Sequence, residues 1–337
     1  MPGILDPIQI GSLQLKNRVV MSPMCQYQAS NQQGVAENWH LIHYVSRAIG
    51  GTGLILLEMT DVEPKGRITE ECLGIYDEAQ IEALQRIVEE CHRHGAKVGL
   101  QISHAGRKST ISGSDIVAPS AVSFSDKSPI PRELLQEEIK ELVTKFGRSA
   151  ELAVKAGFDC IELHAAHGYL LHQFMSPLSN KRTDAYGDRA KFPLEVIAEV
   201  KSKLPAGMPL ICRVSAVEYH EDGYTFEELA EMCEAFKSHG VDVFDVSTGG
   251  NVPLRPQAYP AFRLNYAEAL KKKLGVTVMS VGSLDDPKVA EAAVRNGQTD
   301  MVCIGKGLLR SPYWVKEAAI VLKQDHVLPG VYNLGYE

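Results

Sequence analysis

The segment Phe158-Asp-Cys-Ile-Glu-Leu163-His164-Ala-Ala-His167-Gly-Tyr169 joins a short apolar run to three side chains that carry chemistry. Its first half has the nearly continuous hydrophobicity of a strand that is covered on both faces in a parallel sheet. Its second half places two imidazoles and a phenol where the strand stops and a loop begins. In a barrel of parallel strands, active sites lie at this end of the strands. We therefore expect a barrel strand that delivers His164, His167 and Tyr169 to the active-site face.

These three side chains suit one kind of chemistry. Two imidazoles three residues apart can direct two N–H donors at one ligand oxygen, and a phenol can supply a proton. Together they can polarise a carbonyl group and protonate the carbon next to it. His164 and His167 could also bind a metal ion, but no third ligand stands at a suitable spacing, so we expect no metal site. One of the two histidines could instead be a buried structural residue.

Apolar, β-branched runs of this kind recur along the chain. The eight runs are Arg18–Met21, Leu54–Met59, Lys97–Ile102, Cys160–His164, Leu210–Ser215, Val243–Ser247, Thr277–Val281 and Met301–Ile304. Eight such runs in one chain favour a single (β/α)8 barrel, the TIM barrel of the α/β class, over a doubly wound sheet. No linker divides the chain, so residues 1–337 are expected to form one domain. The Ser- and Pro-rich loop Ser109–Arg132 is expected as an excursion over the C-terminal face.

Stretches with helical periodicity follow most of these runs. They are Asp77–His94, Gln136–Ala156, Thr225–His239, Asp286–Arg295 and Pro312–Leu322. Thr225 and Glu228 have the spacing of a capping box at a helix start. Gly95, Gly157 and Gly240 immediately follow three of the stretches, and each fits a left-handed C-terminal cap.

The composition is that of an ordinary globular protein, with 45% hydrophobic and 23% charged residues. The net charge of −7 disfavours a nucleic-acid partner and an anionic membrane surface. No apolar run approaches the ~18 residues needed to span a bilayer, and the N-terminus lacks the pattern of a signal peptide. The cysteines are scattered without a CxxC pair, which indicates reduced thiols rather than a zinc site or disulfides. We therefore expect a cytoplasmic protein without a membrane partner.

Glycine-rich segments follow the last two runs, at the end where a barrel carries its active site. Gly282 and Gly305 allow backbone N–H groups to approach an anion, and Lys306 adds a positive charge. Barrels commonly bind a phosphate at this place. Tight turns beside an ordinary helix start are the alternative, but within a barrel phosphate binding is the favoured interpretation.

Gln101 and Arg213 are expected deeper in the same rim, where they suit a phosphorylated planar cofactor. The amide of Gln101 could pair with the pyrimidine edge of a flavin, and Arg213 could offset the negative charge of a reduced flavin. The alternative for Gln101 is an amide that serves only the core, and the alternative for Arg213 is a structural ion pair. Cys25 follows the first run, and its place at the rim favours a functional role over that of a small buried hydrophobe.

Three motifs occur in order along nearly the whole chain: Leu15-Lys-Asn-Arg-Val-Val-Met-Ser-Pro-Met-Cys25, Gln101-Ile-Ser-His-Ala-Gly-Arg-Lys108 and His164-Ala-Ala-His-Gly-Tyr169. In this combination they resemble the old yellow enzyme family of flavin-dependent ene-reductases. Because it has cysteine at position 25, the chain resembles the bacterial, thermophilic-type subgroup of this family. Members of that subgroup are often called NADPH dehydrogenases. The resemblance implies a barrel that holds FMN non-covalently and takes hydride from NADPH or, less well, NADH.

The resemblance also implies a substrate and a role for each site residue. The substrates would be α,β-unsaturated carbonyl compounds such as enones, enals and maleimides, with nitro compounds as a further candidate class. His164 and His167 would hold the carbonyl oxygen while the flavin delivers hydride to the β-carbon and Tyr169 protonates the α-carbon. Tyr27 would line the substrate pocket, and Cys25 would tune the flavin potential. The implied flavin contacts are Ser22, Pro23, Met24, Cys25, Met59, Gln101, Arg213, Gly282, Gly305 and Lys306.

Some positions depart from the family pattern. Met59 stands where a small residue is usual, Lys306 replaces a usual arginine, and the segment 187–192 is shortened. Leu334 stands where some relatives place an arginine that reaches a neighbouring subunit, so a homo-oligomer is expected but dimer and tetramer both stay open. Two other functions also stay open: another flavin barrel, such as a dihydroorotate-type dehydrogenase with Cys25 as its base, and a non-enzymatic flavin redox sensor.

Overall fold

Eight parallel strands close into a barrel at the centre of the computed structural model, which describes residues 1–325 and 329–335. Each strand pairs with the next around the ring, and the pairing of the first strand with both of its neighbours closes it. In chain order the barrel strands are β3 (Val19–Met21), β4 (Leu54–Asp61), β6 (Lys97–Ser103), β9 (Cys160–Ala165), β10 (Leu210–Ser215), β11 (Val243–Ser247), β12 (Thr277–Val281) and β13 (Met301–Ile304). The predicted (β/α)8 barrel is thereby confirmed, and the last four strands coincide with the predicted runs.

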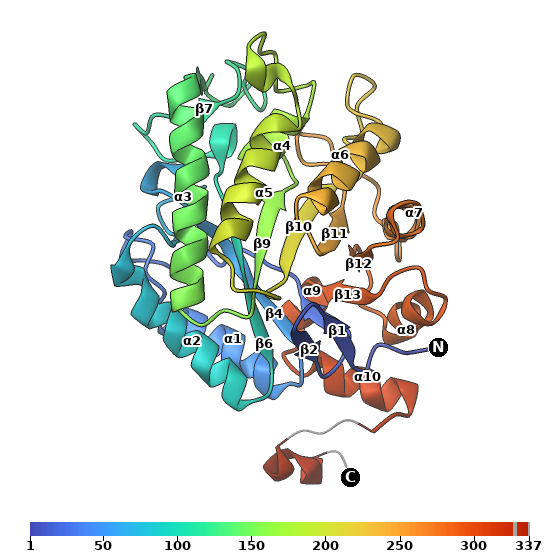
Figure 1. The fold of residues 1–337 in the computed structure, drawn as a ribbon. Coiled ribbons are helices and arrows are strands. Elements are labelled where there is room, and N and C mark those ends of the chain that lie inside the picture. The colour runs from blue at the N-terminus through green and yellow to red at the C-terminus, as the bar shows by residue number, and fades with distance from the viewer. Residues whose placement is uncertain (326–328, 336–337) are drawn as a thin grey trace.

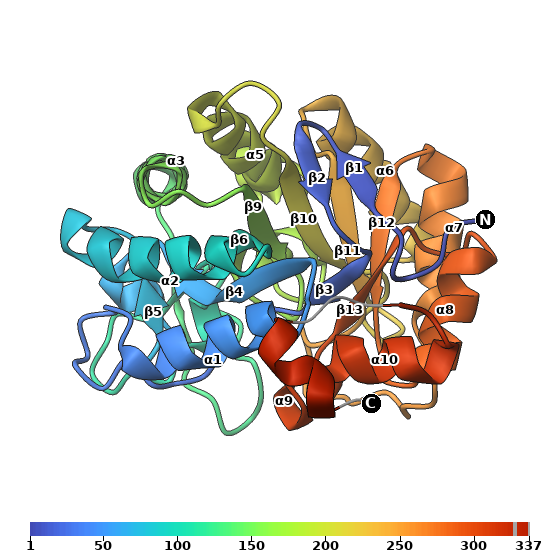
Figure 2. The same cartoon turned by 90° about the horizontal axis from the view of Figure 1, so that it is seen from below.

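Helices surround the strands, as Figures 1 and 2 show from two directions. The long helices are α1 (Asn38–Ile49), α2 (Ile81–Arg93), α3 (Gln136–Lys155), α5 (Lys191–Lys203), α6 (Phe226–Ser238), α7 (Leu264–Leu274), α8 (Pro287–Arg295) and α10 (Trp314–Leu322). Two shorter helices, α4 (Leu170–Met175) and α9 (Lys306–Arg310), follow barrel strands directly or after a short turn. None of the helices in the described ranges combines the length and the apolar character that a membrane crossing requires.

Short elements decorate both ends of the barrel. They are the antiparallel hairpin β1 (Ile8–Ile10) and β2 (Leu13–Leu15), the strand β5 (Leu73–Gly74) beside the end of β4, and the pair β7 (Val117–Ala118) and β8 (Arg132–Glu133). Single turns of 3₁₀ helix occur at Pro64–Gly66, Glu78–Gln80, Gly106–Lys108 and Ala185–Gly187, and a longer one at Gly330–Gly335.

All five predicted helices are present, and their end signals act as expected. Thr225 Oγ1 accepts from the Glu228 backbone N–H at 3.2 Å, and the Glu228 carboxylate accepts from the Thr225 N–H at 2.8 Å, which is a capping box. Gly95, Gly157 and Gly240 have φ of +71°, +87° and +105°, so all three are left-handed as predicted. The helices α1, α5 and α7 were not predicted, because their apolar residues are interrupted by histidines, a proline or a run of lysines.

An apolar floor closes the N-terminal end of the barrel. The inward side chains of the first strand positions pack there against the hairpin β1–β2, which lies below the barrel in Figure 1. The members of this cluster are Ile10, Leu13, Leu15, Val20, Leu54, Leu56, Cys160, Ile211, Val243, Met279, Met301 and Cys303. Because this end is filled with hydrocarbon, a ligand can enter only from the C-terminal face.

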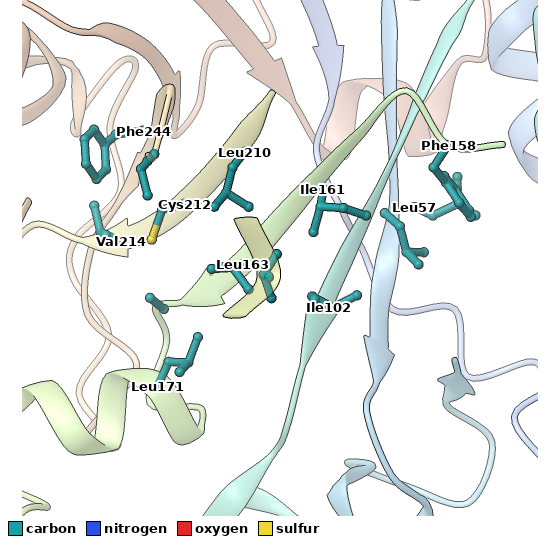
Figure 3. Close-up of a cluster of buried hydrophobic side chains, with 14 of the residues drawn as sticks. Leu57, Ile102, Phe158, Ile161, Leu163, Leu171, Leu210, Cys212, Val214 and Phe244 are labelled. Carbon is teal, nitrogen blue, oxygen red and sulfur yellow. The ribbon is translucent and has the colours of Figure 1, made fainter. Parts of the chain in front are cut away.

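The outward side chains of the strands form a second apolar layer beneath the helices. Figure 3 shows part of it, including Ile161 and Leu163 of β9 and Phe244 of β11, all fully buried. Alternation of inward and outward side chains makes both faces of each strand buried. This double burial explains the continuous apolar runs in the sequence.

The loop Ser109–Arg132 lies over the C-terminal face, as predicted. Arg107 follows the carboxyl end of β6, and its guanidinium donates to the backbone carbonyls of Val122 and Ser123 at 3.2 Å. The ammonium of Lys108 lies 4.7 Å from the centre of the Phe124 ring. These contacts anchor the loop above β6 and β9.

The apolar floor predicts a clear stability effect. Replacing Leu56, which is fully buried, by alanine should lower the free energy of unfolding by about 2–5 kcal/mol, because it removes packing atoms and leaves a cavity. Ile42→Ala, on the exposed face of α1, is the matched control and should change it by less than about 0.5 kcal/mol. Urea unfolding followed by circular dichroism measures both. Equal effects of the two substitutions would contradict the floor as a stability element.

Candidate active site

A cavity of about 620 Å³ opens at the carboxyl ends of the barrel strands. Its volume lies in the range of small-molecule and cofactor sites. Every side chain or glycine that the sequence places at the site lines this cavity: Ser22, Pro23, Met24, Cys25, Tyr27, Met59, Gln101, His164, His167, Tyr169, Arg213, Gly282, Gly305 and Lys306. The structure therefore brings together residues from seven of the eight strand ends, while their individual roles stay predictions.

The cavity also has lining residues to which the sequence assigned no role. They are Arg255, Pro256, Ala258, Phe262, Arg263, Val281, Ser283, Asp285 and Cys303. Most belong to the loop between β11 and α7, which has no periodicity from which its course could be predicted. The available signal was the pair of arginines in a segment that follows the predicted strand 243–247.

A charged layer lies directly above the apolar floor. Arg213 Nε is 3.1 Å from Asp245 Oδ2, and Arg213 also donates to Ser22 Oγ at 3.3 Å. The Gln101 amide donates to Glu162 Oε1 at 2.7 Å. Arg213 thus forms the structural ion pair of the alternative interpretation and also lines the cavity, while its role toward a flavin stays a prediction. Gln101 bonds to a buried carboxylate, and its amide oxygen has no hydrogen-bond partner among the described residues.

Burial dominates the protonation of this layer. It raises the pKa of Glu162 to about 8, and the charge of Asp245 adds to the effect. Burial alone would lower the pKa of Arg213, but the carboxylates of Asp245 and Glu162 outweigh it and hold that pKa above its ordinary value. The guanidinium of Arg213 is therefore a permanent positive charge at the base of the cavity.

His164 and His167 lie one step further out. Their ring centres are 5.2 Å apart, with the rings nearly perpendicular. Burial, followed by the positive charge of Arg213, holds the pKa of both imidazoles well below the ordinary value, so both rings are neutral at pH 7. His164 Nδ1 accepts the Ala166 N–H at 3.3 Å, which leaves its proton on Nε2.

The backbone around His167 is held in an unusual conformation. Its φ is +57°, in the left-handed region that non-glycine residues rarely occupy. Ser215 Oγ accepts its backbone N–H at 3.1 Å, and Ser247 Oγ lies 2.7 Å from its Nε2. Two side chains at the ends of β10 and β11 thus fix both the backbone and the ring.

Tyr169 stands beside the two imidazoles, with its ring centre 4.8 Å from that of His164. It packs on the small apolar cluster that contains Met59 and Cys72. Burial raises its pKa well above the ordinary value, so the phenol keeps its proton at neutral pH. The ammonium of Lys108 lies 4.9 Å from the centre of the Tyr169 ring, which adds a cation beside the phenol.

A buried carboxylate holds the loop that carries Cys25 and Tyr27. Glu58 Oε2 accepts the Gln26 backbone N–H at 2.7 Å, and its Oε1 accepts the Tyr44 hydroxyl at 3.0 Å. Burial raises the pKa of Glu58 to about 7. Burial and then the charge of Glu58 raise the pKa of the Cys25 thiol, which is therefore protonated at neutral pH.

The next residue, Met59, lines the cavity because the strand is irregular at this point. The register between β4 and β6 shifts between Leu57 and Thr60. A bulge of this kind turns a side chain toward a site. The side chain of Met59, at a position where the family usually has a small residue, therefore reaches the cavity wall.

The glycine loops at the ends of β12 and β13 also line the cavity. Gly282 has φ of +129°, and a Cβ there would lie 3.1 Å from Arg263 Cδ, so only glycine fits. Lys306 is the first residue of α9, directly after Gly305. The helix that follows β12 begins later, at Pro287, and the Asp286 side chain caps its first turn. The loops at the ends of β12 and β13 thus expose backbone and one lysine to the cavity.

The fold and this cavity define a barrel protein whose active-site face can hold a large anionic small molecule. The model of the NADH:flavin oxidoreductase / NADH oxidase family matches residues 3–325. An NADPH dehydrogenase of Listeria innocua is 43% identical over the whole length of both chains, and one of Bacillus subtilis is 41% identical over 99% of each chain. A structure of morphinone reductase in complex with tetrahydroNAD superposes with a TM-score of 0.82 at 26% identity, over 98% of this chain and 94% of that chain. The chain belongs to the NADH:flavin oxidoreductase / NADH oxidase family.

Membership makes the chain an oxidoreductase that uses FMN and NAD(P)H. The residues in the cavity fit the cofactor. An unpaired amide oxygen on Gln101 and the charge of Arg213 suit the polar edge of a flavin. At the other end, Gly282 and Lys306 suit its phosphate.

Glu58 predicts a pH-dependent contribution to stability. Its pKa in the folded protein is about 7, above its ordinary value of 4.5, so the folded state binds this proton more tightly than the unfolded chain does. The contribution is complete below about pH 4.5 and is lost as pH rises through 7, by roughly 3 kcal/mol in all. Glu58→Gln should therefore gain stability relative to the wild type by about this amount between pH 4.5 and 8.

Urea unfolding at a series of pH values measures this difference. Glu137→Gln, on the exposed start of α3, is the matched control and should follow the wild-type pH profile. A constant stability difference between Glu58→Gln and the wild type across the range would show that Glu58 does not titrate there.

Proposed function

We propose that this chain is an ene-reductase, which uses NADPH or NADH to reduce the C=C bond of α,β-unsaturated carbonyl compounds. The observation that carries the proposal is the meeting of two neutral imidazoles and a protonated phenol in one cavity, within 5.2 Å and 4.8 Å between ring centres. The chemistry that FMN supplies when bound is hydride transfer, first from the nicotinamide and then to the acceptor. Relatives named NADPH dehydrogenase support NADPH as the donor.

The cofactor contacts follow from the two ends of the cavity. Gln101 and Arg213 would hold the pyrimidine edge, and Gly282, Gly305 and Lys306 would hold the phosphate. The segment Ser22, Pro23, Met24 and Cys25 together with Met59 would line the ring between them. Arg213 would supply positive charge beside this edge, and its carboxylate partner Asp245 keeps it in place.

His164 and His167 would grip the carbonyl oxygen of the acceptor. A neutral imidazole has one N–H to donate, and His164 carries it on Nε2 because its Nδ1 is an acceptor. Electron density moves onto the carbonyl oxygen as hydride reaches the β-carbon. Two such donors would act where that charge forms, which is the most effective position for electrostatic stabilisation.

Tyr169 would then protonate the α-carbon. Its raised pKa keeps the proton available at neutral pH, and the ammonium of Lys108 near its ring stabilises the phenolate that remains. Tyr27, which is 42% exposed at the cavity wall, would line the acceptor pocket. The reaction therefore needs no base from the protein.

The other two functions receive less support from the geometry. A dehydrogenase that uses Cys25 as its base needs an ionised thiol, but burial and Glu58 raise the pKa of this thiol. A redox sensor has no use for a proton donor, whereas Tyr169 is packed beside both imidazoles. Both observations favour reduction of an acceptor.

The direct test is the oxidation of the reduced enzyme by an enone. Enzyme reduced with NADPH under nitrogen should be reoxidised when it is mixed with 2-cyclohexenone in a stopped-flow instrument, because hydride leaves for the β-carbon. The absorbance of oxidised flavin reports the rate. No reoxidation by any of a panel of enones, maleimides and nitroalkenes would refute the proposed function. Turnover of dihydroorotate in its place would favour the alternative dehydrogenase.

Tyr169→Phe tests the proton donor separately. Loss of a general acid slows the step it serves by roughly 10²–10⁴-fold, so reoxidation by enone should slow by about this factor. Reduction by NADPH involves no such proton, and its rate should stay within about twofold. Tyr266→Phe on α7, outside the cavity, is the matched control and should leave both rates unchanged. Unchanged reoxidation in Tyr169→Phe would remove Tyr169 from this role.

A further inference from the structure

A second cation faces the cavity and has no role in the proposed reaction. Arg263 stands directly before α7, and its Nε donates to Thr248 Oγ1 at 2.7 Å. Its guanidinium carbon lies 4.3 Å from the centre of the Phe262 ring. The two terminal nitrogens form no hydrogen bond or ion pair with any described residue, and the side chain lines the cavity.

The position is electrostatically unfavourable for a guanidinium. Burial, and then the like charge of Arg213, lower the pKa of Arg263 to about 10. The buried carboxylate that attracts it, Asp245, is already paired with Arg213. A half-buried cation whose donors face a cavity is stabilised when an anion in that cavity accepts them.

The neighbours of Arg263 indicate where such an anion would lie. A Cβ on Gly282 would be only 3.1 Å from Arg263 Cδ and 3.2 Å from its Cγ, so the side chain passes directly along this loop. Two contacts hold the Arg263 side chain along this loop. Thr248 accepts a hydrogen bond from Nε, and the ring face of Phe262 packs on the guanidinium. The guanidinium therefore stands beside the glycine loop at the end of β12.

We propose that Arg263 binds the phosphate of FMN together with Lys306. This inference rests on the placement of FMN in the proposed function. Lys306 is a flexible point charge, whereas a guanidinium offers two parallel N–H donors that match two phosphate oxygens. The two side chains approach the phosphate loops from different elements, Lys306 from α9 and Arg263 from the β11–α7 loop. They supply two positive charges for a phosphate monoester, which carries close to two negative charges at neutral pH.

Comparison of FMN with riboflavin tests the proposal, because the two flavins differ only in the phosphate. Full-length protein is freed of flavin, and the Kd of each is measured by quenching of flavin fluorescence. Arg263→Gln should weaken FMN binding by roughly ten- to hundredfold, as expected for a lost charge-assisted hydrogen bond, and should leave riboflavin binding unchanged. Arg263→Lys should give an intermediate loss of affinity for FMN. Retained riboflavin binding also shows that the variants fold.

Arg86→Gln is the matched control, because it removes the same charge from an exposed position on α2, outside the cavity. It should leave the ratio of the two Kd values at the wild-type level. An equal loss of affinity for FMN and for riboflavin in Arg263→Gln would make Arg263 a structural residue and overturn the proposal. An unchanged FMN Kd would also overturn it.

Two further measurements test whether Arg263 instead binds an anionic group of the acceptor or of the nucleotide. A raised KM for a carboxylated enone but not for 2-cyclohexenone, with FMN binding intact, would assign Arg263 to the acceptor and overturn the proposal. A raised KM for NADPH but not for NADH, with FMN binding intact, would assign it to the nucleotide with the same consequence. Failure of the enone test with wild-type protein concerns the reaction alone, because the FMN and riboflavin measurements need no turnover.

Discussion

The ion pair between Arg213 and Asp245 governs the arrangement of the whole active-site face. It lies inside the barrel, directly above a floor of hydrocarbon, where an unpaired charge is strongly destabilising. The register of β10 and β11 places the two residues side by side, and the register of β9 and β10 places His164 on the other side of Arg213. One buried cation therefore sets the electrostatic field for the base of the cavity and for the imidazoles beside it. Asp245 is needed because it allows that cation to exist in the barrel.

The field of Arg213 links stability to chemistry. A cation below the cavity suits a cofactor that gains negative charge. Burial, followed by the charge of this cation, lowers the pKa of His164 and His167 and keeps both neutral. Neutral imidazoles donate one N–H each without repelling a nucleotide donor or a cationic neighbour. Further out, Tyr169 is shielded by apolar neighbours and keeps its proton. Along the strands, the inward side chains are thus first apolar, then charged, and then neutral hydrogen-bond donors. A cofactor would lie over the charged layer, and an acceptor would lie over the cofactor beside the neutral donors.

Much of this order could be predicted, because parallel strands in a barrel obey simple rules. Continuous apolar runs predicted all eight barrel strands, and polar residues just after them had to gather on one face. What could not be predicted depends on irregular backbone. Met59 was expected at the site only from the family resemblance, because its position depends on a shift of register in β4. Glu58 contacts Gln26 because α1 and a loop meet there, and neither has a periodic signal. Arg263 was missed for the same reason, since the β11–α7 loop follows no repeating pattern.

The backbone itself carries a last indication of function. Seven non-glycine residues in the described chain have positive φ, and Tyr27, His167 and Ser283 among them line the cavity. Each left-handed residue costs about 1–3 kcal/mol and persists only where its surroundings hold it. His167 is held by Ser215, and the carbonyl of Ser283 accepts the Ala261 N–H at 3.2 Å. Part of the backbone strain therefore lies at the cavity wall, where these contacts hold His167 and Ser283 in a fixed geometry.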